Sequence, residues 1–208
     1  DDTVFGKGGV QMLKLRELNE NDLSIINTWR NDKDLIDSLG APFRFIGPEV
    51  DKRWYENYMN SRNVAVRCAI VDENDKILGL VSLTSIDQLN QSAEFHIMID
   101  SSKNQGRGIG TFAVNEMLKH AFYNLNLQRV ELTVLENNER AKHLYEKCGF
   151  KFEGVRRKSN YKNGTFMNMW MYSILKEEFN GGGYQHNLIL FVVCLLSCKK
   201  QPNSCYKI

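Results

Sequence analysis

A glycine-rich segment between a predicted strand and a predicted helix is suited to bind a phosphate; it reads Gln105-Gly106-Arg107-Gly108-Ile109-Gly110. Glycines let the backbone approach a ligand closely, and the first N–H groups and the dipole of a helix favour an anion such as pyrophosphate. The segment is not a Walker loop, because no Gly-Lys-Ser/Thr follows, and its glycine spacing differs from that of the dinucleotide fingerprint. Taken alone, it fits a ligand-free glycine turn equally well.

A second segment, residues 137–150, reads Asn-Asn-Glu-Arg-Ala-Lys-His-Leu-Tyr-Glu-Lys-Cys-Gly-Phe. Its apolar residues recur at the spacing of one helix face, an asparagine can cap its start, and Gly149 can end it. Tyr145 on that face has two interpretations. It is either a core aromatic residue or an acid, since a tyrosine hydroxyl with a pKa of about 10 can protonate a departing thiolate.

Composition predicts a folded, near-neutral protein. The chain has 208 residues, and 42% hydrophobic against 25% charged residues argues against disorder. With Lys+Arg 27 and Asp+Glu 25, it lacks the charge excess that nucleic-acid binding needs. Cys68 and Cys148 lie in apolar-patterned segments and are predicted to be buried thiols in a reducing, cytoplasmic compartment. No metal site is predicted.

Three regions are distinguished along the chain. Residues 1–11 are interpreted as a leader and residues 12–180 as a single domain. Residues 181–208 form an atypical apolar tail, whose run of nine apolar residues at 188–196 is too short to span a bilayer as a helix.

Hydrophobic periodicity predicts the elements of residues 12–180. Strands are expected at residues 13–18, 64–71, 77–83, 93–99, 130–135, 150–154 and 166–175. Helices are expected from residue 23, around residues 50–58, after residue 108 and from residue 139. Early helices, a meander of strands and two later crossovers predict a mixed α/β sandwich around one central sheet.

Together, the two motifs resemble the acetyl-coenzyme A site of the GNAT acetyltransferase family. In that family a Gln/Arg-x-x-Gly-x-Gly/Ala loop holds the pyrophosphate, and an Asn-x-x-Ala-x-x-Leu-Tyr-x-x-x-Gly-Phe helix lines the site. The resemblance covers the element order of residues 12–180. It implies the GNAT fold, in which a mostly antiparallel twisted sheet, flanked by helices, is splayed at the acetyl-CoA site. It also implies a bacterial, metal-independent N-acetyltransferase and leaves a homodimer open.

The resemblance assigns coenzyme contacts residue by residue. The main chain of Ile97, Met98 and Ile99 would pair with the pantetheine arm, and Asn138 would contact the coenzyme. Backbone donors to the pyrophosphate would come from Gln105, Gly106, Arg107, Gly108, Ile109 and Gly110.

The chemistry of amine acetylation predicts two catalytic groups. A primary amine with a pKa of about 10.4 is protonated at neutral pH, and only its neutral form attacks a thioester. Glu94, on the strand beside the glycine segment, is the predicted base, and Tyr145 is the predicted acid toward the leaving thiolate. His96 lies on the same strand face and could relay a proton, although a packed or solvated histidine is the simpler interpretation.

The acceptor amine is the open question. The chain looks most like bacterial spermidine acetyltransferases and nucleotide-amino-sugar acetyltransferases. However, the loop at residues 38–44 lacks a glutamate pair, which disfavours a polycation. Arg30, Arg44, Ser82 and Ser85 are the predicted acceptor contacts, and an amino sugar or nucleotide-linked amino sugar is favoured. The alternatives are a spermidine or diamine acceptor, a protein N-terminus, or a non-catalytic acyl-CoA-binding module.

Overall fold

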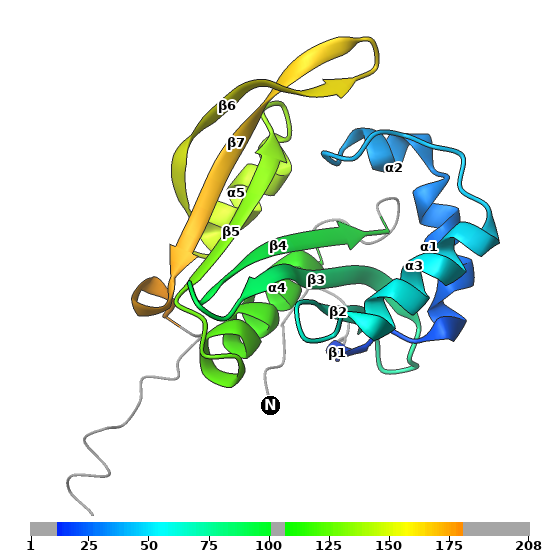
Figure 1. The fold of residues 1–208 in the computed structure, drawn as a ribbon, viewed down its shortest axis with the longest axis horizontal. Helices are drawn as coiled ribbons and strands as arrows, with labels where there is room; N and C mark the ends of the chain where they lie inside the picture. The colour runs from blue at the N-terminus through cyan, green and yellow to red at the C-terminus, as the bar shows by residue number, and fades with distance from the viewer. Residues whose placement is uncertain (1–11, 101–106, 181–208) are drawn as a thin grey trace, which may run out of the picture.

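The computed structural model describes residues 12–100 and 107–180, drawn in Figure 1. The interpretations of residues 1–11 as a leader and of residues 181–208 as an apolar tail concern parts of the chain outside this description. The strands are β1 (Lys14–Glu17), β2 (Val66–Val71), β3 (Ile77–Asp87), β4 (Ser92–Ile99), β5 (Arg129–Leu135), β6 (Lys151–Lys162) and β7 (Thr165–Leu175). The α-helices are α1 (Leu23–Arg30), α2 (Lys33–Asp37), α3 (Pro48–Asn60), α4 (Ile109–Lys119) and α5 (Glu139–Lys147).

All seven strands form one sheet in the order β1-β2-β3-β4-β5-β7-β6. Every neighbouring pair is antiparallel except β4 and β5, which are parallel over three residue pairs only, from Ser92↔Arg129 to Glu94↔Glu131. Beyond Glu94 the two strands diverge, so that β5, β7 and β6 stand away from β1–β4 (Figure 1). The predicted mixed α/β fold with a splayed, mostly antiparallel sheet is confirmed.

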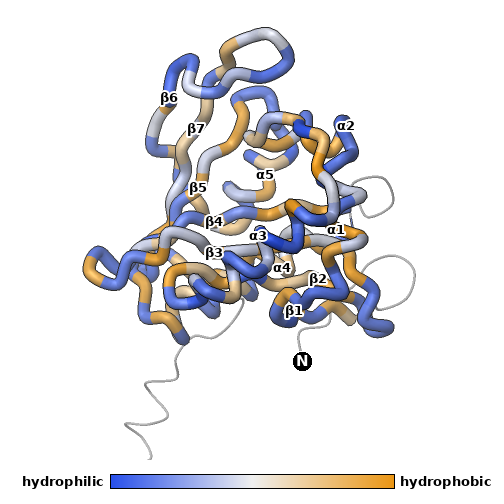
Figure 2. Tube along the Cα trace, turned by 45° about the vertical axis from the view of Figure 1, so that its right-hand side comes forward, coloured by the Kyte–Doolittle hydropathy of each residue, from blue (hydrophilic) through white to orange (hydrophobic). Residues whose placement is uncertain are grey.

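Helices cover both faces of the sheet because alternate strand residues are apolar on each side. On β3, Val81 and Leu83 join the larger core with α4 and α5, whereas Leu80 joins a smaller core with α1 and α3. The α4 helix is held by Ile109, Ala113 and Met117, which lie on one face and are at most 1% exposed. Hydrophobic segments gather in the strands and in α4, while much of α3 and the outer turns are hydrophilic (Figure 2).

Two elements differ most from the sequence-based prediction, and β3 also continues to Asp87, four residues past its predicted end. The five-residue α2 was not predicted; the Asp32 side chain starts it by accepting hydrogen bonds from the N–H groups of Asp34 and Leu35. The strand predicted to end at Gly154 continues to Lys162, and a two-residue turn joins it to β7. Asn163 and Gly164 in that turn have φ of 48° and 83°, as a type I′ hairpin requires.

A set of polar side chains fastens residues 36–41 to the opposite half of the molecule. Lys162 Nζ donates to the carbonyl oxygens of Ile36, Leu39 and Ala41 at 2.6, 2.7 and 2.8 Å. Asn160 Nδ2 donates to Gly40 O at 2.6 Å, and Asn138 Nδ2 donates to Ser38 O at 2.8 Å. Carbonyl groups at and beyond the end of a helix have few backbone partners, so these donors supply hydrogen bonds to them; Ile36 O also accepts from Leu39 N–H. Residues 36–41 are thereby held across the opening of the sheet.

Within the described residues, no helix is both long and apolar enough to cross a bilayer, and no group of three or more His, Cys, Asp or Glu side chains could hold a metal ion. Cys148 is buried and Cys68 is half-buried, and both are free thiols. Burial raises the pKa of each to about 11, which keeps them protonated at neutral pH.

We expect Lys162→Met to lower the free energy of unfolding by about 2 kcal/mol, because three carbonyl groups lose a buried ammonium donor. Lys52→Met is the matched control, since Lys52 is exposed on α3. Urea unfolding of both variants measures the difference. Equal stability of the two variants would show that the Lys162 contacts do not hold residues 36–41.

Candidate active site

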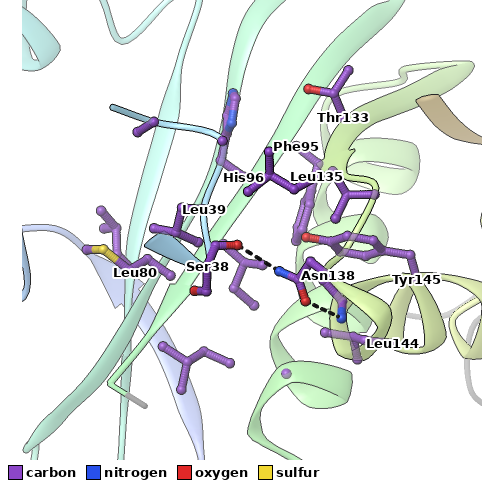
Figure 3. Close-up of a pocket in the computed structure, with 18 of the residues that line it drawn as sticks. Ser38, Leu39, Leu80, Phe95, His96, Thr133, Leu135, Asn138, Leu144 and Tyr145 are labelled. Atoms are coloured by element: carbon purple, nitrogen blue, oxygen red, sulfur yellow. Dashed lines mark hydrogen bonds between the residues drawn. The ribbon is translucent and has the colours of Figure 1, made fainter. Parts of the chain in front are cut away.

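The divergence of β4 and β5 opens a cavity of about 930 Å³. Its walls come from α1, α2 with the loop after it, α3, β2, β3, the second half of β4, the end of β5, the start of α4, α5, β6 and β7; Figure 3 shows part of this lining. One wall therefore holds the glycine-rich start of α4 together with α5, and the other holds the first helices and the face of the sheet that they cover.

Along this cavity, one edge of β4 is not paired with a strand. Asp100 N–H donates to Leu78 O, so the even-numbered residues of β4 direct their N–H and C=O groups toward β3. The odd-numbered residues of β4 point to the β5 side, where the last pair, Glu94↔Glu131, uses the N–H of Phe95; the C=O of Phe95 and the main-chain groups of Ile97 and Ile99 lie beyond this pairing. This free edge could hydrogen-bond an extended chain that carries amide groups. Of the three residues predicted to do so, Ile97 and Ile99 face the gap, while the main chain of Met98 is used by β3.

The start of α4 presents the second half of a coenzyme-sized site. Gly108 adopts the left-handed conformation with φ of 77° and precedes the helix, whose first N–H groups at Ile109, Gly110 and Thr111 have no intrahelical partner. Gly110 has a packing role as well, because a Cβ there would lie 2.9 Å from Leu144 Cδ2 on α5. Gln105 and Gly106 lie outside the described residues, while Arg107 lies within them.

Tyr145 packs as a core aromatic residue, and its role as an acid stays a prediction. Its side chain is 7% exposed, and its ring makes an edge contact with Phe95 at 6.3 Å and a tilted contact with Phe150 at 5.7 Å. The ring projects from α5 toward β4 with the hydroxyl at the end nearer β4 (Figure 3). Burial raises the pKa of the Tyr145 hydroxyl, so the group stays protonated and able to donate at neutral pH.

Asn138 lines the cavity, but both ends of its side chain have partners in the protein. Oδ1 caps α5 by accepting from Ala141 N–H at 3.0 Å, and Nδ2 donates to Ser38 O (Figure 3). In this arrangement Asn138 connects the two walls, and a coenzyme contact by its side chain would replace one of these bonds.

On β4, His96 lines the cavity, whereas Glu94 is not among the described lining residues. His96 Nε2 lies 3.7 Å from Glu94 Oε2 and 2.9 Å from Thr84 Oγ1. Although about half of the His96 side chain is exposed, desolvation lowers the pKa of His96; Arg67 lowers it further and Glu94 opposes the shift. A neutral imidazole next to a carboxylate can accept a proton.

The four predicted acceptor residues separate into two pairs. Arg30 and Ser82 line the cavity, and Arg30 also forms an ion pair with the buried Asp51. Arg44 and Ser85 are exposed and do not line the cavity.

Sequence reasoning missed Arg67, which lines the cavity from β2. Its signal was a single cation inside an otherwise apolar strand pattern. The described lining residues include no Asp or Glu, but they include several cations: Arg30, Arg67, Arg140, Lys147 and Arg156.

Comparisons with known proteins agree with this arrangement. Spermidine N(1)-acetyltransferase of Vibrio cholerae is 31% identical over 168 residues, which cover 80% of this chain and 95% of that protein. A putative ribosomal N-acetyltransferase of Bacillus subtilis is 35% identical over 105 residues, or 50% of this chain and 57% of that protein. A crystal structure of the Vibrio cholerae spermidine N-acetyltransferase in complex with CoA and spermine has a TM-score of 0.74 and 29% identity, covering 80% of this chain and 96% of that chain.

The resemblance found in the two motifs is confirmed at the level of the family. Residues 12–151 match the family model described as an acetyltransferase (GNAT) domain, and this range contains both the glycine-rich segment and Tyr145. The free edge of β4, the start of α4 and the α5 tyrosine are therefore parts of one domain with a known activity, and the chain belongs to the GNAT family of N-acetyltransferases.

Proposed function

We propose that this enzyme transfers an acetyl group from acetyl-CoA to the primary amine of a small molecule, and that transfer takes place beside Tyr145. The observation that carries the proposal is the free edge of β4 next to the Tyr145 hydroxyl, within one cavity. When bound, acetyl-CoA supplies the thioester that a neutral amine attacks.

The coenzyme would lie between the free edge of β4 and α5. The main chain of Ile97 and Ile99 offers donors and acceptors to the amides of the pantetheine arm. Gly108 and the first turn of α4 would offer N–H groups and a positive helix end to the pyrophosphate. Arg140 and Lys147 on the cavity side of α5 add positive charge for phosphate groups.

Two side chains on opposite sides of the gap would move the protons. We assign base catalysis to His96, which lines the cavity, with Glu94 stabilising the imidazolium that forms. With Nε2–H donating to Thr84 Oγ1, Nδ1 holds the lone pair that accepts the amine proton. As the C–N bond forms and the C–S bond breaks, Tyr145 would donate its proton to the departing sulfur.

Two classes of acceptor, a polyamine and an amino sugar, are compatible with the proposed reaction. The relatives reported above include spermidine acetyltransferases, which favour the polyamine alternative over an amino sugar. The described cavity wall bears cations and no carboxylates, which disfavours a polycation. A thiol-release screen over polyamines, amino sugars, nucleotide-linked amino sugars and N-terminal peptides tests the activity and ranks the acceptors. Coenzyme binding without thiol release with any amine would contradict the proposed function.

We expect Tyr145→Phe to lower kcat by roughly 100-fold with little change in acetyl-CoA affinity, because the ring still packs while the proton donor is lost. Thiol release at saturating substrates and calorimetric CoA binding measure the two effects. Tyr161→Phe is the control, since Tyr161 is 59% exposed on β6. Full turnover by Tyr145→Phe, when chemistry limits the rate, would leave Tyr145 as a packing residue.

The pH dependence distinguishes His96 from Glu94 as the base. A base with a lowered pKa is neutral at lower pH, so kcat/KM should rise with pH through an acid limb set by His96. Glu94 raises the pKa of His96, so Glu94→Gln should shift this limb to lower pH. The exposed Glu56→Gln should leave the limb in place. A Glu94→Gln variant that is slow at neutral pH and recovers as the pH rises would identify Glu94 as the base.

A further inference from the structure

Three polar side chains form a row across the sheet on the acceptor side of the cavity. Arg67 on β2 is paired in register with Ser82 on β3, and Ser82 is paired with His96 on β4. Directly opposed residues on neighbouring strands project from the same face, so all three point toward the face that α1 and α3 cover. All three line the cavity.

The Arg67 guanidinium has no carboxylate partner within the described residues. Its Nε is buried and makes no hydrogen bond. The group instead lies over the ring of Trp54, at 4.9 Å from the ring centroid, and near Tyr58, at 5.8 Å. Stacking on aromatic faces holds a guanidinium in place, but it leaves the N–H donors available and the charge uncompensated.

Arg30 provides an internal comparison. It also lies over Trp54, at 5.6 Å, but it forms an ion pair with Asp51, which is only 1% exposed. Asp51 therefore compensates Arg30, whereas Arg67, the other cation over Trp54, has no carboxylate partner among the described residues. A partly desolvated cation without a counter-ion is costly, and an anion from the ligand would remove that cost.

We propose that Arg67 binds a carboxylate or phosphate group of the acceptor, so that the acceptor is an amine that also carries an anionic group. This inference rests on the proposed function, because it places the acceptor amine at His96 in the same row. Neighbouring strands lie about 4.8 Å apart, so two steps across the sheet separate the backbones at His96 and Arg67 by roughly 10 Å. A molecule with an amine at one end and an anion at the other matches this row.

A series of acceptors that differ only in their terminal group tests the proposal. The series comprises ω-amino carboxylates, aminoalkyl phosphates, aminoalcohols and α,ω-diamines, each over the same graded chain lengths. The wild-type enzyme should show the lowest KM with one of the anionic sets. Arg67→Gln should raise KM for that set by about 10- to 100-fold and change KM for aminoalcohols by less than about twofold.

Charge reversal and a matched control complete the test. Arg67→Glu should reverse the preference toward the diamines, because the same position then attracts a cation. Arg53→Gln should change nothing, since Arg53 is exposed on α3. Removal of Arg67 also affects His96, but that effect is common to every acceptor and cancels within the series.

Calorimetric binding of the same compounds in the presence of CoA keeps this test independent of turnover. Tighter binding of an anionic compound to the wild type than to Arg67→Gln supports the proposal even if no compound is acetylated. The absence of acetylation would contradict the proposed function but not the role of Arg67 in binding. Wild-type binding that favours the diamines, or anionic compounds that bind Arg67→Gln as tightly as the wild type, would overturn the role of Arg67.

Discussion

The end of the parallel pairing between β4 and β5 is the constraint on which the site depends. The two strands share only three residue pairs, and beyond Glu94 the odd-numbered residues of β4 have main-chain groups without a strand partner. An unpaired strand edge inside a protein is costly unless something hydrogen-bonds to it. The same divergence creates the cavity, so the free donors and acceptors and the space for a ligand arise together.

The cations that line the cavity include two pairs, which lie on different walls. Arg140 and Lys147 line the cavity from α5, on the side that we propose for the coenzyme phosphates, whereas Arg30 and Arg67 lie against Trp54 on the side that we propose for the acceptor. Of these four cations, only Arg30 has a buried carboxylate partner among the described residues. The fold and the activity are therefore shared across the family, and we propose that a few side chains on α1 and β2 set the acceptor.

Features that local sequence patterns encode, such as helix faces and helix ends, could be predicted from the sequence. The face of α5 with Tyr145 and the stop at Gly149, which has φ of 94°, followed from helical spacing and glycine chemistry. The extension of β6 carried a usable signal in Asn163-Gly164, but α2 has only five residues, too few for a periodic pattern. The partners of a side chain could not be predicted from local patterns. Whether Arg67 has a counter-ion, or whether Asn138 bonds to Ser38, depends on segments far apart in the chain.

The side-chain amide of Asn138 links the two walls of the cavity, because its oxygen and its nitrogen have partners on different walls. Its oxygen starts the helix that carries Tyr145, and its nitrogen holds the carbonyl of Ser38 in the segment above the cavity. Loss of the second bond leaves the first intact. Moving residues 36–41 away from the opposite wall would require breaking this bond together with the four bonds from Lys162 and Asn160, whereas the cap of the helix that carries Tyr145 would stay in place.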